Sequence, residues 1–125
     1  MAPMKHVDEE GQRAAALTKA ALEGMKRLGL SPAESASVLG VHAGVLAAMR
    51  KGDRVVDGYN GEAESADGLV RVVKRLNTLL GGEETKWRSW LRRESPQLGS
   101  RPLDLIVQRH GAEKVAAYLE HTSQL

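Results

Sequence analysis

Apolar residues recur at intervals of three and four along almost the whole chain of 125 residues. That spacing places them on one face of an α-helix, whereas a half-buried strand would need alternation at every second residue. No segment alternates for long enough to make a convincing strand. The sequence therefore predicts an all-α fold with about seven helices and no sheet.

The clearest local signal is a pair of short helices joined by a turn. Residues 31–34, Ser-Pro-Ala-Glu, form a capping box with proline at the first helical position. The helix that begins there must end before Gly40, and a second helix fits residues 42–50. Two helices joined by a short turn with glycine indicate a helix-turn-helix. A longer helix is expected before them, over residues 8–28.

A change of pattern divides the chain into two parts. Residues 51–64 contain three glycines and no sustained period, which is typical of a linker or hinge. We therefore assign residues 1–62 to a helix-turn-helix region with its linker and residues 63–125 to a second, small helical module. The helices expected in this module begin at Ser65, at residue 83, at Pro102 and after Gly111.

Composition excludes several classes of protein. The chain has no cysteine, which rules out a disulfide framework and a cysteine zinc site. Its start, MAPMKHVDEE, lacks the features of a secretion signal, and no run of about 18 apolar residues occurs. We expect a soluble, cytoplasmic protein without a membrane segment. The balance of 18 basic and 16 acidic residues neither requires nor excludes nucleic acid.

Catalytic signatures are missing from the sequence. The four histidines are scattered and form no metal-binding spacing, and there is no G-x-S-x-G nucleophile motif or phosphate-binding glycine loop. We therefore predict no catalytic residue, no metal site and no cofactor, and hence a protein that is not an enzyme.

The predicted helix-turn-helix supplies candidate DNA contacts. On the second helix, His42 and Arg50 are the side chains able to read base edges. Ser31, Lys51 and Arg54 are placed as phosphate contacts. The other exposed positions of that helix are alanines, so the alternative interpretation is a helix pair kept for packing or dimerisation.

Aromatic residues are scarce and unevenly placed. The chain has no phenylalanine, and its four aromatic residues are Tyr59, Trp87, Trp90 and Tyr118. The two tryptophans, three residues apart, share a helix face and can each bury about 150–250 Å². Core packing is the default role, above all for Trp87, and a protein interface is the alternative. Residues 71–93 also carry seven basic against two acidic residues, a candidate surface for phosphates or for an acidic protein.

The second module contains a series of motifs in a particular order. They are Trp90-Leu91 followed by Pro96, the segment Gly99–Leu105 with Arg101-Pro102-Leu103, then Gly111, and finally Val115 with Leu119. In this order they resemble the toxin-binding domain of the Xre/MbcA/ParS antitoxin family, over about residues 65–122. The helix-turn-helix lies where that family carries its Xre-like region. The chain departs from the family at its end, EHTSQL, where members often have Arg-Ile-x-x-Gly.

The resemblance implies an antitoxin of a type II toxin–antitoxin system. Its partner would be a RES-domain toxin that degrades NAD, so NAD would be the toxin's substrate and not a cofactor of this chain. The antitoxin would form a homodimer, cover the toxin's active-site cleft with its C-terminal region, and repress its own operon by binding operator DNA. The matching positions place Trp90, Arg101, Pro102 and residues 111–125 at the toxin.

The last helix also fits such a role on physical grounds. A helix that lies in a groove needs an apolar face and a few polar anchors, and Val115, Tyr118, Leu119 and the Leu125 carboxylate supply them. That carboxylate can mimic the charge of a phosphate in an NAD cleft. Two alternatives remain: a stand-alone helix-turn-helix transcription regulator whose second module only dimerises, and a structural scaffold.

Overall fold

A computed structural model describes the backbone of residues 2–125 and the side chains from Glu9 onward. Seven helices occupy the described range, and its only strand-like pairing is an isolated bridge between Ser95 and Ser100. The all-α prediction is confirmed. No helix in this range is long and apolar enough to span a bilayer.

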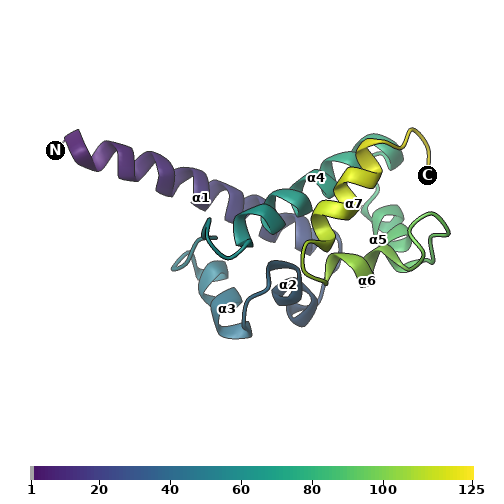
Figure 1. Ribbon diagram of the computed structural model, residues 1–125, viewed down its shortest axis with the longest axis horizontal. Coiled ribbons are helices and arrows are strands. Elements are labelled where there is room, and N and C mark those ends of the chain that lie inside the picture. The colour runs from purple at the N-terminus through teal and green to yellow at the C-terminus, as the bar shows by residue number, and fades with distance from the viewer. Residues whose placement is uncertain (1) are drawn as a thin grey trace.

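The helices form a body from which the start of the chain extends (Figure 1). In order they are α1 (Ala2–Arg27), α2 (Pro32–Leu39), α3 (Ala43–Lys51), α4 (Glu62–Leu80), α5 (Glu84–Arg92), α6 (Pro102–Ile106) and α7 (Gly111–Glu120). Helix α1 begins six residues before its predicted start at residue 8. Pro3 does not prevent this, because proline is tolerated in the first turn of a helix.

Local signals set the α2–α3 pair. Ser31 Oγ accepts from the Glu34 N–H at 3.0 Å, and Glu34 Oε1 accepts from the Ser31 N–H at 2.8 Å, which completes the capping box. At the other end Gly40 has φ +70°, and the Val41 N–H bonds the Ala36 carbonyl at 3.0 Å. A left-handed glycine closes a helix in this way because it lacks a Cβ. The pair is compatible with the predicted helix-turn-helix.

Helix α4 runs through the centre of the molecule between α1 and α7 (Figure 1). It begins at Glu62, so the prediction that Ser65 caps it is wrong, and Ser65 is buried inside the helix. The contact with α7 is close at Gly68, where a Cβ would lie 2.8 Å from the Glu113 backbone nitrogen. Only glycine therefore fits this crossing without a shift of one helix.

One hydrophobic core includes residues from both predicted modules. Its fully buried members include Met25 of α1, Leu28 in the turn after α1, Leu46 of α3, Leu69 of α4 and Leu119 of α7. The division into residues 1–62 and 63–125 stays a prediction, and its boundary falls in the first turn of α4.

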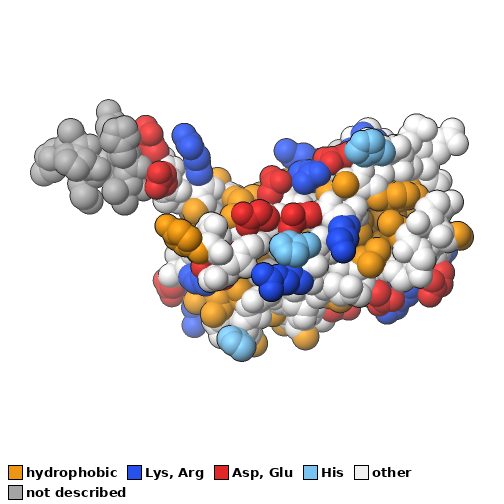
Figure 2. All heavy atoms as spheres, in the orientation of Figure 1, with side chains coloured by type: hydrophobic (Ala, Val, Ile, Leu, Met, Phe, Trp, Pro, Cys, Tyr) orange, Lys and Arg blue, Asp and Glu red, His pale blue; other side chains and the backbone are white. Residues whose placement is uncertain are grey.

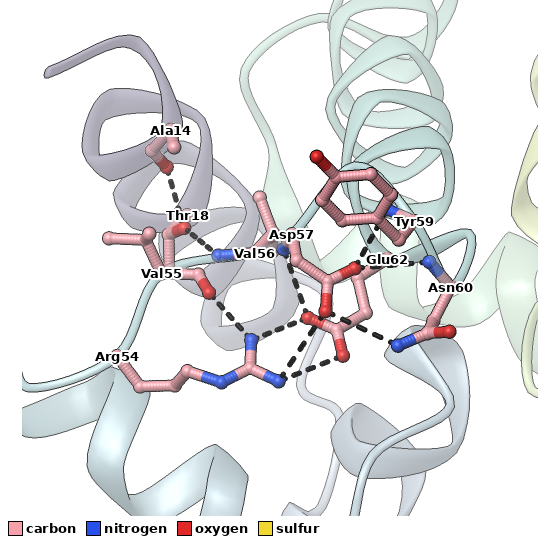
Figure 3. A network of polar contacts seen from close by, with 9 residues as sticks. All are labelled: Ala14, Thr18, Arg54, Val55, Val56, Asp57, Tyr59, Asn60 and Glu62. Carbon is pink, nitrogen blue, oxygen red and sulfur yellow. Dashed lines mark hydrogen bonds and ion pairs between the residues drawn. The ribbon is translucent and has the colours of Figure 1, made fainter. Parts of the chain in front are cut away.

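The segment between α3 and α4 is anchored, although its composition predicts a hinge (Figure 3). Thr18 on α1 donates to the Ala14 carbonyl at 2.6 Å and accepts from the Val56 N–H at 2.9 Å. Arg54 donates to both Glu62 oxygens, at 2.6 and 3.0 Å. Glu62 is buried, so its charge needs such a partner. These bonds fix the segment to α1 and α4.

Candidate functional site

Helix α5 carries both tryptophans, and the first of them is fully enclosed. Trp87 has 0% exposed surface, and its Nε1 donates to the Gly81 carbonyl at 2.7 Å. The Arg27 guanidinium carbon lies 4.5 Å from the centroid of the ring, in a cation–π contact. The prediction that Trp87 packs the core is confirmed.

Two arginines of α5 cap the C-terminal end of α1. Arg88 Nε donates to the Arg27 carbonyl at 2.9 Å, and Arg92 Nη2 donates to the Gly29 carbonyl at 3.2 Å. The last carbonyls of a helix have no partner within it and favour nearby cations. Arg27 Nε also donates to Glu84 Oε2 at 2.7 Å. This face of α5 is therefore occupied by contacts within the molecule.

Two arginines of α4 bind the end of α7, Arg75 through backbone carbonyls and Arg71 through a side chain. Arg75 donates to the Leu119 carbonyl at 3.1 Å and to the Thr122 carbonyl at 2.9 Å. Arg71 pairs with Glu120, and these hydrogen bonds lower the pKa of the Glu120 carboxyl group. Four of the seven basic residues in the segment 71–93 thus join helices to one another, and the segment is not one continuous basic patch.

The second tryptophan lies at the edge of a cavity of about 260 Å³. Trp90 is 8% exposed, and within the described part of the chain its Nε1 has no hydrogen-bond acceptor. Hydroxyl, cationic and apolar side chains surround it. The lining residues are Leu80, Thr85, Lys86, Ser89, Trp90, Arg93 and Leu125. Figure 2 shows apolar side chains gathered at this end of the molecule, in the region of α5 and α7.

The segment before α6 holds two further predicted contact residues. Pro102 is buried as the first residue of α6. Arg101 is half-buried and donates to both Asp104 oxygens, at 3.0 and 2.7 Å, which lowers the pKa of the Asp104 carboxyl group. The exposed part of Arg101 is thus already paired with Asp104. Pro102 starts α6 and has little surface available to a partner.

The predicted partner-binding face of α7 is turned inward. Val115 and Leu119 are 0% exposed because they pack in the core where α7 crosses α4. This corrects the role expected of these two residues, since they have no surface to offer a partner while the module is folded. Tyr118 is half-buried and Leu125 is 44% exposed, so these two stay accessible.

The sequence of this region matches a known family. Residues 75–122 match the model described as the antitoxin Xre/MbcA/ParS C-terminal toxin-binding domain. This part of the chain is therefore similar in sequence to Xre/MbcA/ParS toxin-binding domains. The match confirms the resemblance found in the motif order. No curated protein matches the chain.

The predicted DNA contacts lie outside the toxin-binding domain and have different surroundings. His42 is an exposed residue at the start of α3, and Arg50 and Lys51 are exposed in its last turn. Ser31 is exposed, but its hydroxyl is held in the capping box. DNA contact by these four residues stays a prediction.

Arg54, the remaining predicted phosphate contact, is already paired within the molecule, and its contact with DNA stays a prediction. Its guanidinium is bound to Glu62 and to the Val55 carbonyl (Figure 3), and Glu62 raises the pKa of the Arg54 side chain. Asp57 adds a longer ion pair at 3.9 Å. Arg54 is therefore a structural residue that joins the segment after α3 to the start of α4.

A groove of about 760 Å³ separates α1 from the end of α3. Its floor includes Leu22, Leu30 and Met49, and its rim carries more cationic than acidic side chains. The charged residues lining it are Lys19, Glu23, Lys26, Arg50, Lys51 and Arg54. Arg50 and Lys51 thus belong to a wider basic surface. Arg54 also lines it, but its charge is balanced by Glu62.

Lys86, Ser89 and Arg93 beside Trp90 were not singled out as site residues from the sequence. A signal for them existed, since residues 86, 90 and 93 are spaced by four and three and so share a helix face. The same charge type occurs at Arg88 and Arg92, on the face that contacts α1. The contact between the end of α1 and α5 distinguishes the paired Arg88 and Arg92 from Lys86 and Arg93.

Proposed function

We propose that the protein is the antitoxin of a type II toxin–antitoxin pair and that it inhibits a RES-domain toxin that degrades NAD. The toxin-binding domain over residues 75–122 is the observation that carries the proposal. The C-terminal region covers the active-site cleft of the toxin and so denies NAD access. The accessible residues Tyr118 and Leu125, the surface of Arg101 and the cavity that Trp90 lines are the contacts that this role would use.

Co-expression tests this proposal directly. The protein encoded by the neighbouring reading frame is produced alone and together with this chain, and cellular NAD is measured in both cultures. We expect NAD to fall with the neighbour alone and to be restored by the antitoxin, with the two proteins purifying together. A neighbour that leaves NAD unchanged, or that does not bind this chain, would contradict the proposal.

The end of the chain allows a sharper version of the experiment. Deleting residues 120–125 would remove Glu120 and the Thr122 carbonyl, which hold Arg71 and Arg75, and so would damage the domain itself. Deleting residues 123–125 keeps those contacts and removes the exposed Leu125. If the terminus blocks the cleft, the shorter deletion releases toxin activity while the antitoxin keeps its melting temperature; unchanged neutralisation would exclude a role for the terminus.

We propose operator binding as a second function, carried by the exposed cations at the end of α3. Arg50 and Lys51 continue into the basic rim formed by Lys19 and Lys26, and phosphate contacts of this kind make affinity depend steeply on salt. In a homodimer, two such surfaces would bind the two half-sites of an operator. Binding to the chain's own promoter, measured at several salt concentrations, should weaken steeply with salt and exceed binding to a scrambled duplex. Equal binding to both duplexes would remove autorepression from the proposal.

The alternative of a stand-alone regulator makes a different prediction. It requires sequence-specific DNA binding without a co-purifying toxin, whereas an antitoxin requires the toxin partner whether or not DNA is bound. Light scattering of the purified chain and of its complex gives the number of copies of each protein. A monomeric chain in both samples would contradict the homodimer.

A further inference from the structure

The indole nitrogen of Trp90 distinguishes the α5 cavity from the rest of the domain. Indole N–H groups in largely buried positions usually have an acceptor, as Trp87 has in the Gly81 carbonyl. Trp90 is 92% enclosed, and its Nε1 donates to no acceptor within the described residues; it is not among their buried unpartnered atoms, so this nitrogen has access to solvent. Because Trp90 lines the cavity, this unpartnered N–H is a donor available to an incoming group.

The charges around the cavity favour an anionic group. Lys86 and Arg93 line it together with the hydroxyl-bearing Ser89, and the lining contains no acidic side chain. Lys86 has one ion pair, with Glu83 at 3.7 Å, and both side chains are more than half exposed, so that pair is weak. Arg93 has no ion pair among the described residues, unlike Arg88 and Arg92 on the same helix. Leu125 also lines the cavity, but among the described residues its carboxylate makes no ion pair with Lys86 or Arg93, so the cavity combines two available cations with other donors.

The size and shape of the cavity favour a side chain over a free small molecule. Its volume of about 260 Å³ lies below the range of about 300–1,000 Å³ typical of ligand pockets. The Trp90 ring, Leu80 and Leu125 supply an apolar wall against which the methylene groups of an entering side chain would pack. A carboxylate at the tip would reach the cations and the indole N–H.

We propose that this cavity receives an aspartate or glutamate side chain from the surface of the toxin, and that Lys86, Trp90 Nε1 and Arg93 bind its carboxylate. The inference rests on the proposed function, which supplies the partner, and adds the chemistry of one contact. A protein carboxylate is favoured over a nucleic-acid phosphate because the cavity lies inside the toxin-binding domain. The basic rim on which DNA binding was proposed is on α1 and α3.

Binding measurements with three single variants test the contact. The affinity of the full chain for the protein encoded by the neighbouring reading frame is compared with that of Arg93→Gln, Trp90→Phe and the control Arg109→Gln. Arg109 is an exposed cation of the same domain that does not line the cavity. Loss of one hydrogen bond to a charged group should weaken binding about tenfold or more in each of the first two variants. The control should stay within about twofold.

Trp90→Phe keeps an aromatic ring in the core and removes only the N–H, and thermal melting checks that each variant is folded. If Trp90→Phe does not fold, Arg93→Gln decides alone, because that side chain is exposed. Parental affinity in a folded Arg93→Gln variant would overturn the proposal. Failure of the parental chain to bind the toxin would instead overturn the proposed function, and the cavity assignment with it.

The two tryptophans also provide a spectroscopic test. A ¹⁵N-labelled full chain gives one indole N–H signal for each, and Trp87 serves as the internal control because its donor is already engaged. On addition of the toxin, the Trp90 signal should move and the Trp87 signal should stay in place. A Trp90 signal that moves with a DNA duplex but not with the toxin would overturn the proposal in favour of a phosphate ligand.

Discussion

The two faces of α5 have nearly the same residue types and opposite bonding states. On one face, Trp87 donates to the Gly81 carbonyl after α4, and Arg88 and Arg92 donate to carbonyls at the end of α1. Toward the cavity, the side chains of Trp90 and of Arg93, the residue that follows α5, have no such partner among the described residues. The difference teaches that cation density along the sequence does not locate a binding surface. The proposed contact instead lies where the fold leaves donors without acceptors.

The same distinction separates the ends of the molecule. On α4, Arg71 and Arg75 are engaged by the end of α7, and Arg54 is engaged by Glu62. On α3, Arg50 and Lys51 stay exposed in the last turn. The proposed toxin contact and the proposed DNA contact therefore both lie on surfaces where the described part of the chain has cations without a strong ion pair.

Among variants that test the difference between the two faces, Trp87→Ala is expected to cause the largest loss of stability. Removing a fully buried large aromatic ring lowers the free energy of unfolding by about 3–5 kcal/mol, and here the bond to Gly81 and the contact with Arg27 go with it. Trp90→Ala should destabilise less, because one edge of that ring borders the cavity. Denaturant unfolding followed by circular dichroism measures both. A greater loss at Trp90 than at Trp87 would break the comparison.

A smaller effect separates the cations of the two faces. The double variant Arg88→Met with Arg92→Met removes two hydrogen bonds to carbonyls at the end of α1. We expect a loss of about 1–2 kcal/mol in the free energy of unfolding, at about 0.5–1 kcal/mol for each exposed bond. The matched double variant Lys86→Met with Arg93→Met should stay within about 0.5 kcal/mol of the parent. Equal losses in the two variants would show that the faces do not differ.

Sequence reasoning was most successful where the cause is local. The capping box at residues 31–34 sets the start of α2, and the left-handed Gly40 sets its end. Each signal lies at the helix end that it determines. Pro102 likewise begins α6. Proline, glycine and a capping serine act on their own backbone, so no knowledge of distant segments is needed to place them.

It was least successful where the partner of a side chain is distant in sequence. Arg88 and the Arg27 carbonyl are 61 residues apart, and nothing local distinguishes Arg88 from Arg93. The apolar stripe of α7 predicted that Val115 and Leu119 are buried against something. Whether the cover is a toxin or the chain itself depends on the close crossing of α4 at Gly68, which the stripe does not encode.

The smallest effect on stability is expected from lowering the pH. Protonation of the Glu120 carboxylate removes the ion-pair partner of Arg71. Arg71 lowers the pKa of Glu120 below its ordinary value of 4.5, so the folded chain binds this proton less tightly than the unfolded chain does. The pairing therefore stabilises the fold above about pH 4.5, and this contribution is lost as the pH falls further. Asp104 beside Arg101 adds a contribution of the same sign.

Melting temperatures measured from pH 6 down to about pH 3 should therefore fall in the acid part of the range. Glu120→Gln should begin lower and fall less steeply, because its side chain has no charge to lose. Glu64→Gln, at an exposed carboxylate without an ion pair among the described residues, should follow the parent. If Glu120→Gln and Glu64→Gln gave the same curve, engagement of Arg71 would contribute nothing to stability. The difference between hydrogen-bonded and unpaired cations would then be a difference in geometry that has no effect on the free energy of unfolding.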